Sequence, residues 1–285
     1  MTIRHVLKPS DLEAFKQALI RDERSPDTVS KYMRDTGAFY TYLPEDKSVD
    51  KEAVIAWKRE LSRSYKDSST NSMLAAVNSL LAFLGWGECR VKQLRVQRKS
   101  FRDTSRELTK EEYERLLAAA RKRNNHRLYL LIQAICSTGI RVSEHRFLTV
   151  ESLRTGMAWV DNKGKRRAVL LPVELAKVLL RYCKQQGITS GPIFITRNGT
   201  PMNRCNIWAA MKRLSSDAGV DHRKVYPHNL RHLFAVTYYQ LEKDIVRLAD
   251  ILGHASVETT RIYTATNIFD QRRSLSRLGL VPCRV

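Results

Sequence analysis

Four short segments in the second half of the chain carry polar side chains that packing alone does not require. Together they hold two arginines, a lysine, two histidines and a tyrosine, namely Arg141, Lys163, His228, Arg231, His254 and Tyr263. Arginine, lysine and histidine are the donors that would surround one phosphodiester, and a tyrosine hydroxyl is a competent nucleophile toward phosphorus. No pair of carboxylates accompanies them to hold two metal ions, which argues against a metal-dependent nuclease. The set predicts phosphoryl transfer without a metal.

Each segment also has a simpler explanation when it is taken alone. Arg141 lies in the first turn of an expected helix, where the helix dipole disfavours a cation. A bound anion beside Arg141 would explain a cation at this position, and an ion pair with Glu144 would explain it equally well. Lys163 lies in a basic turn of the kind that usually faces solvent, although a lysine there can also donate a proton to a substrate. Tyr263 could be a half-buried aromatic residue with its hydroxyl in water. The combination of these groups favours phosphate chemistry.

The third segment carries two histidines and an arginine on one predicted helix. His228 and Arg231 are three residues apart and therefore share a face of that helix. An imidazole that titrates near neutral pH, beside a bidentate guanidinium, suits phosphate chemistry. His228 and His232 have the four-residue spacing of two helical metal ligands, which leaves a metal site as the alternative.

Local patterns predict the elements that position these groups. An apolar helix from Leu128 to Cys136 ends at Gly139, and a new helix is expected with Arg141 in its first turn. Two short apolar runs around an Asn-Lys-Gly-Lys turn predict a β-hairpin over 156–172. Helical patterns follow at about 173–186, 203–218, 228–241, 245–252 and 256–264.

The first part of the chain has the pattern of four helices joined by short turns. Ser10 and Ser25 are the expected N-caps of the first two, with Pro26 at the first position of the second. A third helix is expected over 50–63, and a fourth follows Asp67.

The net charge indicates a polyanionic partner. The 285 residues include 50 lysines and arginines against 29 aspartates and glutamates, a formal net charge of +21. Residues 1–100 hold 18 basic and 13 acidic side chains, whereas residues 101–285 hold 32 and 16. A merely well-solvated surface is the alternative, although a small domain usually carries a net charge of only about 2–8. Nucleic acid is the first candidate partner.

Several protein classes are excluded by the same composition. The start has no apolar signal region, and the longest apolar run, Leu128 to Cys136, is too short to span a bilayer. The five cysteines are widely spaced without a C-x-x-C, so they fit neither a disulfide framework nor a zinc ribbon. They suit a reducing cytoplasm. No P-loop motif is present, so a P-loop NTPase is not expected.

The predicted fold class is mainly α with a small antiparallel β-hairpin, in two domains. We expect a helical domain over 1–94 and a second domain, which carries the candidate residues, over 107–285. Residues 95–106 are basic, have no sustained apolar period and are expected to form an extended linker.

The order and spacing of the candidate residues resemble the tyrosine recombinases of the lambda-integrase family. Thr138 to Glu144 has the form T-G-x-R-x-S-E, and His228 to Ala235 has the form H-x-L-R-H-x-F-A. Leu252 to His254 reads L-G-H, and Tyr263 follows that histidine by nine residues. Lys163, which is followed by glycine and basic residues, looks like the β-hairpin lysine of the family.

The resemblance implies a nucleophile and a phosphate clamp. Tyr263 would attack the scissile phosphate, which gives a 3′-phosphotyrosyl link and a free 5′-hydroxyl. Arg141 and Arg231 would bind the non-bridging oxygens and stabilise the pentavalent transition state. Because the covalent link conserves the bond energy, rejoining would need neither ATP nor a metal cofactor. His145 and Arg146 depart from the family pattern, which usually has apolar residues after the glutamate.

The resemblance also implies the groups that move protons. Lys163 would protonate the 5′-oxygen leaving group, and His228 would assist proton transfer at the tyrosine. His254 would hydrogen-bond the phosphate. The hairpin turn is about one residue shorter than the family pattern, so Lys165 remains an alternative to Lys163 as the catalytic lysine.

The implied partner is double-stranded DNA with specific core sites. In the family, a helical core-binding (SAM-like) DNA-binding domain, which residues 1–94 resemble, and a catalytic domain, which residues 107–285 resemble, close as a clamp on the duplex. Four protomers then exchange strands through a Holliday junction. DNA contacts are expected from the linker and the hairpin, at Arg98, Lys99, Lys165, Arg166 and Arg167. The segment Asn267 to Leu278 is expected to be a helix that docks on a neighbouring protomer or on its own domain.

The implied function is site-specific DNA recombination in the bacterial cytoplasm. It would serve integration and excision, or resolution, of a mobile element or replicon, and an accessory directionality factor is a further candidate partner. Two alternatives share the same charge and much of the same pattern. One is a non-catalytic basic helical DNA-binding protein, and the other is an enzyme like a type IB topoisomerase.

Overall fold

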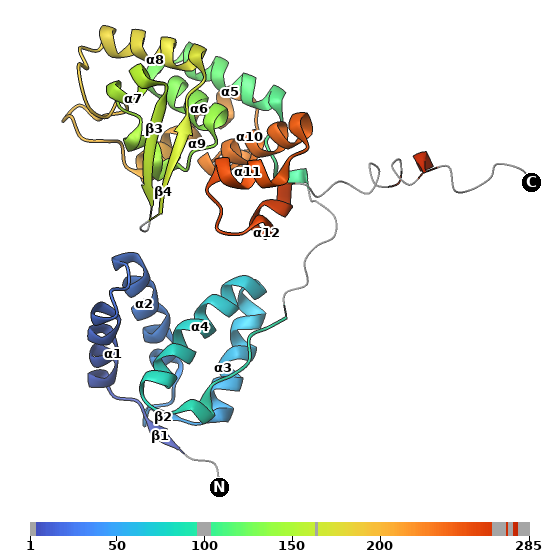
Figure 1. Cartoon of the computed structure of the whole chain (residues 1–285). Coiled ribbons are helices and arrows are strands. Elements are labelled where there is room, and N and C mark those ends of the chain that lie inside the picture. Colours follow the sequence, from blue (N-terminus) through green and yellow to red (C-terminus); the bar gives the residue numbers. More distant parts are fainter. Residues whose placement is uncertain (1–3, 96–103, 163–164, 264–271, 273–275, 279–285) are drawn as a thin grey trace, which may run out of the picture. The chain divides into compact units, whose positions relative to one another are not determined.

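The computed structural model describes residues 4–95, 104–162, 165–263, 272 and 276–278. The chain divides into two compact units, residues 1–98 and 99–285, which Figure 1 draws in blue to teal and in green to red. The division falls inside the segment 95–106 that was expected to link two domains. The mainly α-helical fold class is confirmed, and each unit has one small antiparallel sheet among its described residues. Within the described ranges, no helix has the length and apolar character needed to cross a membrane.

Unit 1 is a bundle of four helices with a two-stranded sheet at one end (Figure 1). In chain order the described elements are β1 (His5–Val6), α1 (Pro9–Arg21), α2 (Pro26–Tyr42), β2 (Ser48–Val49), α3 (Lys51–Ser64), α4 (Asp67–Phe83) and the 3-10 turn η1 (Gly87–Cys89). The core lies between the helices, where Phe39, Val54 and Leu80 are fully buried.

Two N-caps were predicted in unit 1, and the structure confirms one of them. The side chain of Ser25 caps α2, as predicted. Helix α1 begins earlier than predicted, at Pro9, because the carboxylate of Asp11 accepts the backbone N–H of Lys8 at 2.9 Å. Ser10 therefore lies in the first turn of the helix and is not its cap.

Unit 2 surrounds helix α6 with helices and one hairpin. In chain order its described elements are η2 (Thr104–Arg106), α5 (Lys110–Lys122), α6 (His126–Thr138), η3 (Val142–Phe147), α7 (Val150–Thr155), β3 (Met157–Asn162), β4 (Lys165–Leu170), α8 (Val173–Gln185), α9 (Arg204–Ala218), η4 (His222–Lys224), α10 (Pro227–Glu242), α11 (Ile245–Leu252), α12 (Val257–Thr260) and η5 (Arg261–Tyr263). Leu131, Ile132 and Ile135 of α6 are fully buried, so α6 is central to the core of this unit.

The hairpin formed by β3 and β4 has one buried face and one exposed face. Val160 lies directly opposite Arg167 in the antiparallel register, and Val160 is buried whereas its neighbour Trp159 is half exposed. Because side chains alternate along a strand, Arg167 shares the buried face with Val160 and Val169. In the backbone register, Lys165 pairs with Asn162 at the start of β4.

Two segments next to the predicted site form 3-10 turns where α-helix was expected. Arg141 is the N-cap of η3 and does not lie in the first turn of an α-helix. Thr149 caps α7 soon afterwards, so the chain has room for only a short turn between α6 and α7. The helix expected over 256–264 is shorter, with α12 followed by the turn η5.

Candidate active site

Arg231 is the central cation of the candidate site. It lies in the first half of α10 and is only 2% exposed. Its Nη1 donates to the carbonyl of Gly139 at 2.5 Å, and its Nη2 donates to the carbonyl of Leu252 at 2.7 Å. These carbonyls lie at the C-terminal ends of α6 and α11, where the helix dipole favours a cation. Burial, with the charge of Arg141 acting in the same direction, lowers the pKa of Arg231 to about 10, so the group stays charged at neutral pH.

Gly139 permits this close packing. It ends α6 in the left-handed conformation, with φ of +66°. A Cβ at this position would come within 2.4 Å of the Phe234 ring, so both the backbone angle and the neighbouring side chain favour glycine. The glycine of the T-G-x-R pattern therefore brings the end of α6 against α10 and within reach of Arg231.

His254 lies against Arg231. Its Nε2 is 3.1 Å from Nη2 of Arg231, and its Nδ1 is 2.8 Å from Oγ1 of Thr260. Because a guanidinium only donates, Nε2 must accept, and the proton of the neutral ring must be on Nδ1. Burial and then the charges of Arg231 and Arg141 lower the pKa of His254 to about 4. The imidazole is therefore neutral at pH 7 in the DNA-free protein.

Arg141 and Glu144 form an ion pair beside this cluster. Nη1 of Arg141 donates to Oε1 of Glu144 at 2.8 Å, and the backbone N–H of Arg141 donates to Oε2 at 2.8 Å. Nη2 of Arg141 also donates to the carbonyl of Gly253 at 3.3 Å. The side chain of Glu144 is only 2% exposed, whereas that of Arg141 is 33% exposed. Glu144 thus holds both the backbone and the guanidinium of Arg141, so the ion pair considered from the sequence is present, and part of the Arg141 side chain still reaches solvent.

Arg167 is placed differently from the sequence expectation. Its guanidinium was expected to meet DNA, but Nη2 donates to Oε2 of Glu144 at 2.6 Å and Nη1 donates to the carbonyl of Ile251 at 2.8 Å. The side chain is 14% exposed, so it faces the protein and not the solvent. The alternation of side chains along the strand places Arg167 on the same face as the buried Val160. This alternation is the feature of the sequence that could have predicted that Arg167 faces the protein. Glu144 as the acceptor shared by two arginines was also missed, because only the fold brings β4 to η3.

Tyr263 lies inside the same cluster at the end of η5. It is only 3% exposed, and its ring packs edge-on against His232 at 5.0 Å and nearly parallel to His254 at 6.2 Å between centroids. Burial raises the pKa of Tyr263, although the charge of Arg231 and a hydrogen bond from it act in the opposite direction. The hydroxyl is therefore protonated at neutral pH, and attack by its oxygen requires a proton acceptor.

His228 is a further imidazole of the site. Burial, followed by the charges of Arg231 and Arg141, lowers the pKa of His228, so the ring is neutral and has a free lone pair at pH 7. It precedes Arg231 by one helical turn on α10. The structure thus brings five of the six predicted groups, Arg141, His228, Arg231, His254 and Tyr263, into one electrostatically coupled cluster.

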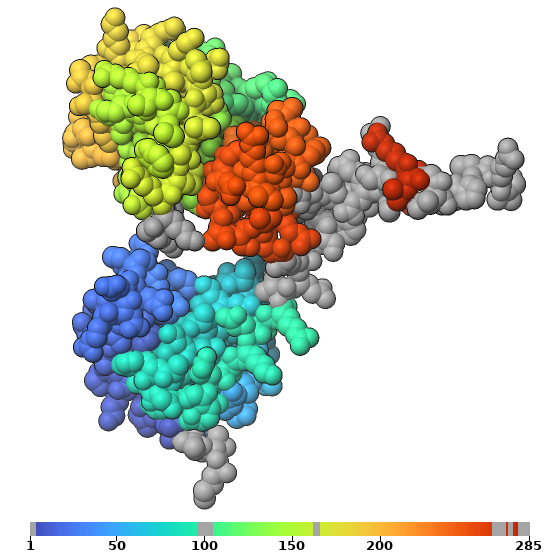
Figure 2. All heavy atoms as spheres, in the orientation of Figure 1, coloured from blue at the N-terminus to red at the C-terminus, as the bar shows by residue number. Residues whose placement is uncertain are grey.

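Figure 2 shows this region from outside, where the orange segment containing α10, α11 and α12 packs against the yellow-green hairpin of the same unit. Arg166 lies on the opposite face of β4 from Arg167, is exposed, and stacks over Trp159 at 4.7 Å. Lys165 is placed only by its backbone register. Lys163, Arg98 and Lys99, and most of the segment 267–278, lie outside the residues that the structure describes.

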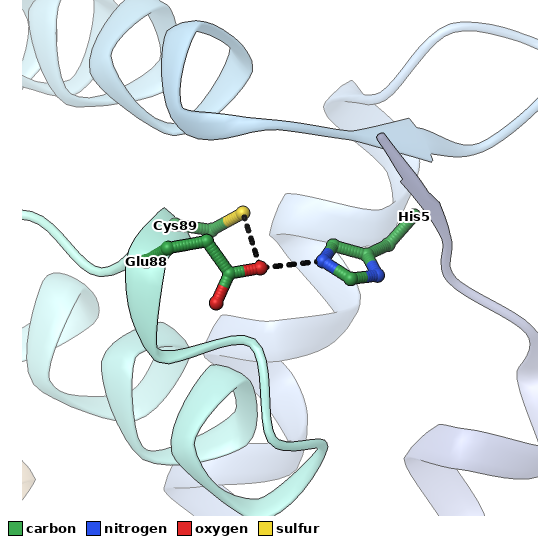
Figure 3. Close-up of side chains that lie close together, drawn as sticks. All are labelled: His5, Glu88 and Cys89. Carbon is green, nitrogen blue, oxygen red and sulfur yellow. Dashed lines mark hydrogen bonds and ion pairs between the residues drawn. The ribbon is translucent and has the colours of Figure 1, made fainter. Parts of the chain in front are cut away.

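One group of residues, in unit 1, has the composition of a metal site (Figure 3). Of the residues that the structure describes, only His5, Glu88 and Cys89 bring three ligand atoms within 4.8 Å of one another. Nε2 of His5 is 2.6 Å from Oε1 of Glu88, which is a direct hydrogen bond, and the His5 ring stacks on Trp86. Ligand atoms around one zinc ion, each at about 2.0–2.3 Å from it, would stand more than 3 Å apart. The hydrogen bond therefore accounts for the group, and the His228–His232 pair does not belong to it.

Comparisons with known proteins agree with this geometry. The phage integrase family matches residues 106–268, and the phage integrase N-terminal SAM-like domain matches residues 12–88. Tyrosine recombinase XerD of Vibrio cholerae is 30% identical over 84% of this chain and 85% of its own length. Tyrosine recombinase XerA of Pyrococcus furiosus is 26% identical over 96% of both chains.

Solved structures show the same fold. A crystal structure of XerA recombinase is 25% identical, covers 97% of this chain and 99% of its own, and has a TM-score of 0.53. A lambda integrase tetramer bound to a Holliday junction is 19% identical, covers 89% of this chain and 76% of its own, and has a TM-score of 0.72. The chain belongs to the phage integrase family, the tyrosine-type site-specific DNA recombinases.

Proposed function

We propose that this chain cleaves and rejoins duplex DNA at specific sites, with Tyr263 as the nucleophile. The observation that carries this proposal is the burial of Tyr263 among Arg231, His254 and His232, which is where a phosphate would meet both a nucleophile and cations. Its membership of the phage integrase family supports the same reaction.

In the proposed cleavage step, the phenolic oxygen of Tyr263 forms a bond to phosphorus as the bond from phosphorus to the 5′-oxygen breaks. The phenolic proton passes to the lone pair of His228, and the leaving 5′-oxygen takes a proton from Lys163 or Lys165. The products are a 3′-phosphotyrosyl link and a free 5′-hydroxyl. Attack by a 5′-hydroxyl of another strand reverses the step, so rejoining needs no external energy source.

Arg141 and Arg231 are proposed to bind the non-bridging oxygens of the scissile phosphate. The three described hydrogen bonds of Arg231 to Gly139, Leu252 and His254 use three of its five N–H donors, so two remain for Tyr263 and the phosphate. Arg141 adds a partly exposed guanidinium on the same side. Preorganised charges of this kind stabilise the negative charge that develops in the transition state.

His254 is proposed to change its role when the phosphate arrives. In the DNA-free protein its Nε2 accepts from Arg231 and cannot donate. The negative charge of a bound phosphate would raise the pKa of His254, and the protonated ring could then donate from Nε2 to a phosphate oxygen. The phosphate would also draw Arg231 toward itself, which frees Nε2.

The proposed partner is double-stranded DNA carrying specific core sites, on which four protomers would exchange strands through a Holliday junction. Among similar structures are XerH bound to its difH substrate and a lambda integrase tetramer bound to a Holliday junction. We extend these partners to this chain on the basis of the shared fold, with the exposed Arg166 and the linker residues Arg98 and Lys99 as proposed DNA contacts. The proposed task is integration and excision, or resolution, of a mobile element or replicon in a bacterial cytoplasm, with an accessory directionality factor as a further proposed partner.

The test is a strand-exchange assay. DNA fragments from around the gene are incubated with the purified protein, fragments that become covalently attached are sequenced, and two copies of the captured site are placed on a supercoiled plasmid. We expect deletion or inversion between the two sites, and none with Tyr263→Phe. Relaxation of plasmids that lack the site would favour a topoisomerase, and binding without any covalent product would favour a non-catalytic DNA-binding protein.

A further inference from the structure

We propose that Arg167 is a positioning residue that keeps Arg141 available to the scissile phosphate. This inference rests on the proposed function and assigns a role to a side chain that pairs with Glu144 and faces the protein. Arg167 comes from the hairpin strand β4, and its guanidinium bonds to residues of two other elements.

The contacts of Arg167 close a ring of hydrogen bonds around the site. Arg167 bonds to Glu144 at 2.6 Å, Glu144 bonds to Arg141 at 2.8 Å, and Arg141 bonds to the carbonyl of Gly253 at 3.3 Å. The second bond of Arg167, to the carbonyl of Ile251 at 2.8 Å, returns to the same turn at the end of α11. The ring therefore joins the hairpin, η3 and the turn that carries His254.

Gly253 makes room for this ring. It has φ of +63°, and a Cβ on it would lie 2.3 Å from Cδ and 2.6 Å from Nε of Arg167. The aliphatic part of Arg167 thus packs directly against the backbone of the turn, and only glycine leaves space for it. The glycine of the L-G-H pattern is explained by this contact as well as by its backbone angle.

The way Glu144 divides its two oxygens is the central observation. Oε1 accepts from the side chain of Arg141, whereas Oε2 accepts from the side chain of Arg167 and the backbone N–H of Arg141. A carboxylate and a guanidinium prefer to pair through both oxygens and two parallel N–H groups. Because Arg167 occupies Oε2, Glu144 can hold Arg141 through one side-chain bond only. The other donors of Arg141 then remain free for the phosphate and for Gly253.

Stability alone does not explain a guanidinium at this position. Burial lowers the pKa of Arg167, and the charge of Arg141 acts in the same direction, although Glu144 opposes both. The net effect is a lowered pKa, so the folded protein disfavours this cation more than water does. Its Nε is also buried without a hydrogen-bond partner among the described residues, which is a further cost. An apolar side chain of similar length would avoid both costs. The proposed role explains the guanidinium instead: Arg167 occupies Oε2 of Glu144 and leaves donors of Arg141 free.

The test compares Arg167→Met with a matched control, Arg181→Met, which removes the same group from an exposed position on α8. Single-turnover cleavage of the captured site is measured with saturating protein, and DNA affinity is measured separately. We expect Arg167→Met to slow cleavage by ~100-fold, the scale of losing one preorganised charge contact, with DNA affinity and folding retained. Arg167→Lys should have intermediate activity, because one ammonium cannot span both Glu144 and Ile251.

A neutral substrate separates this role from a merely structural one. The substrate is a duplex whose scissile phosphate carries a methyl group in place of one non-bridging oxygen. Less negative charge then develops on this phosphate in the transition state, so a misplaced Arg141 slows cleavage less. We expect the defects of Arg167→Met and Arg141→Met to shrink on this substrate by similar factors. In addition, Glu144→Gln combined with Arg167→Met should be no slower than Arg167→Met alone, because the neutral amide no longer attracts Arg141.

The outcomes are distinguishable from failure of the proposed function. If the wild-type protein does not cleave its site, the proposed function is wrong. If the wild type cleaves and Arg167→Met cleaves equally fast, the positioning role is contradicted. It is also contradicted if the defect is the same size on the charged and the methylated substrate, or if it follows a lowered melting temperature.

Discussion

Arg231 donates a hydrogen bond to Nε2 of His254 over 3.1 Å, so the DNA-free site holds this histidine as an acceptor. The proton on the other nitrogen, Nδ1, points to Thr260 at 2.8 Å. Burial, together with the charges of the two arginines that would hold the phosphate, lowers the pKa of His254 and keeps its ring neutral. Entry of the phosphate is expected to reverse that state, because its charge offsets the charges that keep the ring neutral.

The first prediction concerns the titration of His254. Because its pKa is lowered from 6.5 to about 4, its ring proton signals in an NMR pH titration should move near pH 4 in the free protein. Binding of the DNA site to the Tyr263→Phe protein should raise that midpoint. His254→Gln identifies the resonance by its absence. A midpoint near 6.5 in the free protein would contradict the proposed environment of His254.

The same pKa shift predicts how stability changes with pH. The folded protein binds the His254 proton less tightly than the unfolded chain does, so acid favours the unfolded state. This contribution to stability is fully present above pH 6.5 and decreases as the pH falls from 6.5 toward 4. In urea unfolding measured across this range, His254→Gln should lose less stability than the wild type. An equal loss in both proteins would show that His254 does not supply this dependence.

The second prediction concerns the contribution of Arg231 to the stability of unit 2. Arg231→Met leaves the carbonyls of Gly139 and Leu252 without their donor, so unit 2 should lose about 2–4 kcal/mol of unfolding free energy. Arg154→Met, at an exposed position of α7, is the control and should change stability little. Chemical denaturation measures both. Equal stability of the two variants would contradict the buried role of Arg231, whatever happens to cleavage.

The sequence predicts the parts of the site that short local segments carry, and it does not predict contacts between segments that are far apart in the chain. Arg141, His228, Arg231, His254 and Tyr263 were found from residue type and spacing, because short local segments carry both. The position of Arg167 depends on a contact with Ile251, 84 residues away, which no local pattern encodes. Strand alternation could have shown that Arg167 shares a face with Val160, but Arg167 was expected to contact DNA, and no local pattern shows that it meets Glu144.

The fold was predicted to a similar depth. Two predicted helix boundaries are confirmed, because α2 begins at Pro26 after the cap Ser25 and α6 ends at Gly139. The strands β1 and β2 have two residues each, which is too short for any periodic pattern. The start of α1 was misplaced because Asp11 and Pro9 supply a cap that competes with Ser10.

The third prediction decides between Lys163 and Lys165 as the general acid. Replacing the bridging 5′-oxygen of the scissile phosphate by sulfur makes the leaving group so acidic that it needs no proton. The variant that loses the general acid should therefore recover cleavage on the sulfur substrate. We expect this of Lys163→Met, and we expect no comparable recovery for Lys165→Met. The reverse result would assign the role to Lys165, the first residue of β4.

The fourth prediction separates the two reasons for glycine at position 253. Gly156 and Gly253 both have positive φ, +72° and +63°, but a Cβ would meet nothing within 4 Å at Gly156 and would meet Arg167 at 2.3 Å at Gly253. Gly156→Ala should cost only the left-handed conformation, about 1–2 kcal/mol. Gly253→Ala should cost more and should also slow cleavage, because Arg167 must move. Equal costs in urea unfolding, with normal cleavage, would contradict the packing of Arg167 under the turn.

The central claim, that Tyr263 attacks DNA, is tested most directly by trapping its covalent link. The captured site is synthesised with a nick a few nucleotides beyond the scissile phosphate, so the short fragment with the free 5′-hydroxyl dissociates and rejoining cannot occur. With the wild type we predict a covalent protein–DNA complex whose proteolytic fragment carries the nucleotide on Tyr263. Tyr263→Phe should bind the same duplex and form no such complex. A wild-type complex linked through another residue, or equal trapping by Tyr263→Phe, would contradict the account.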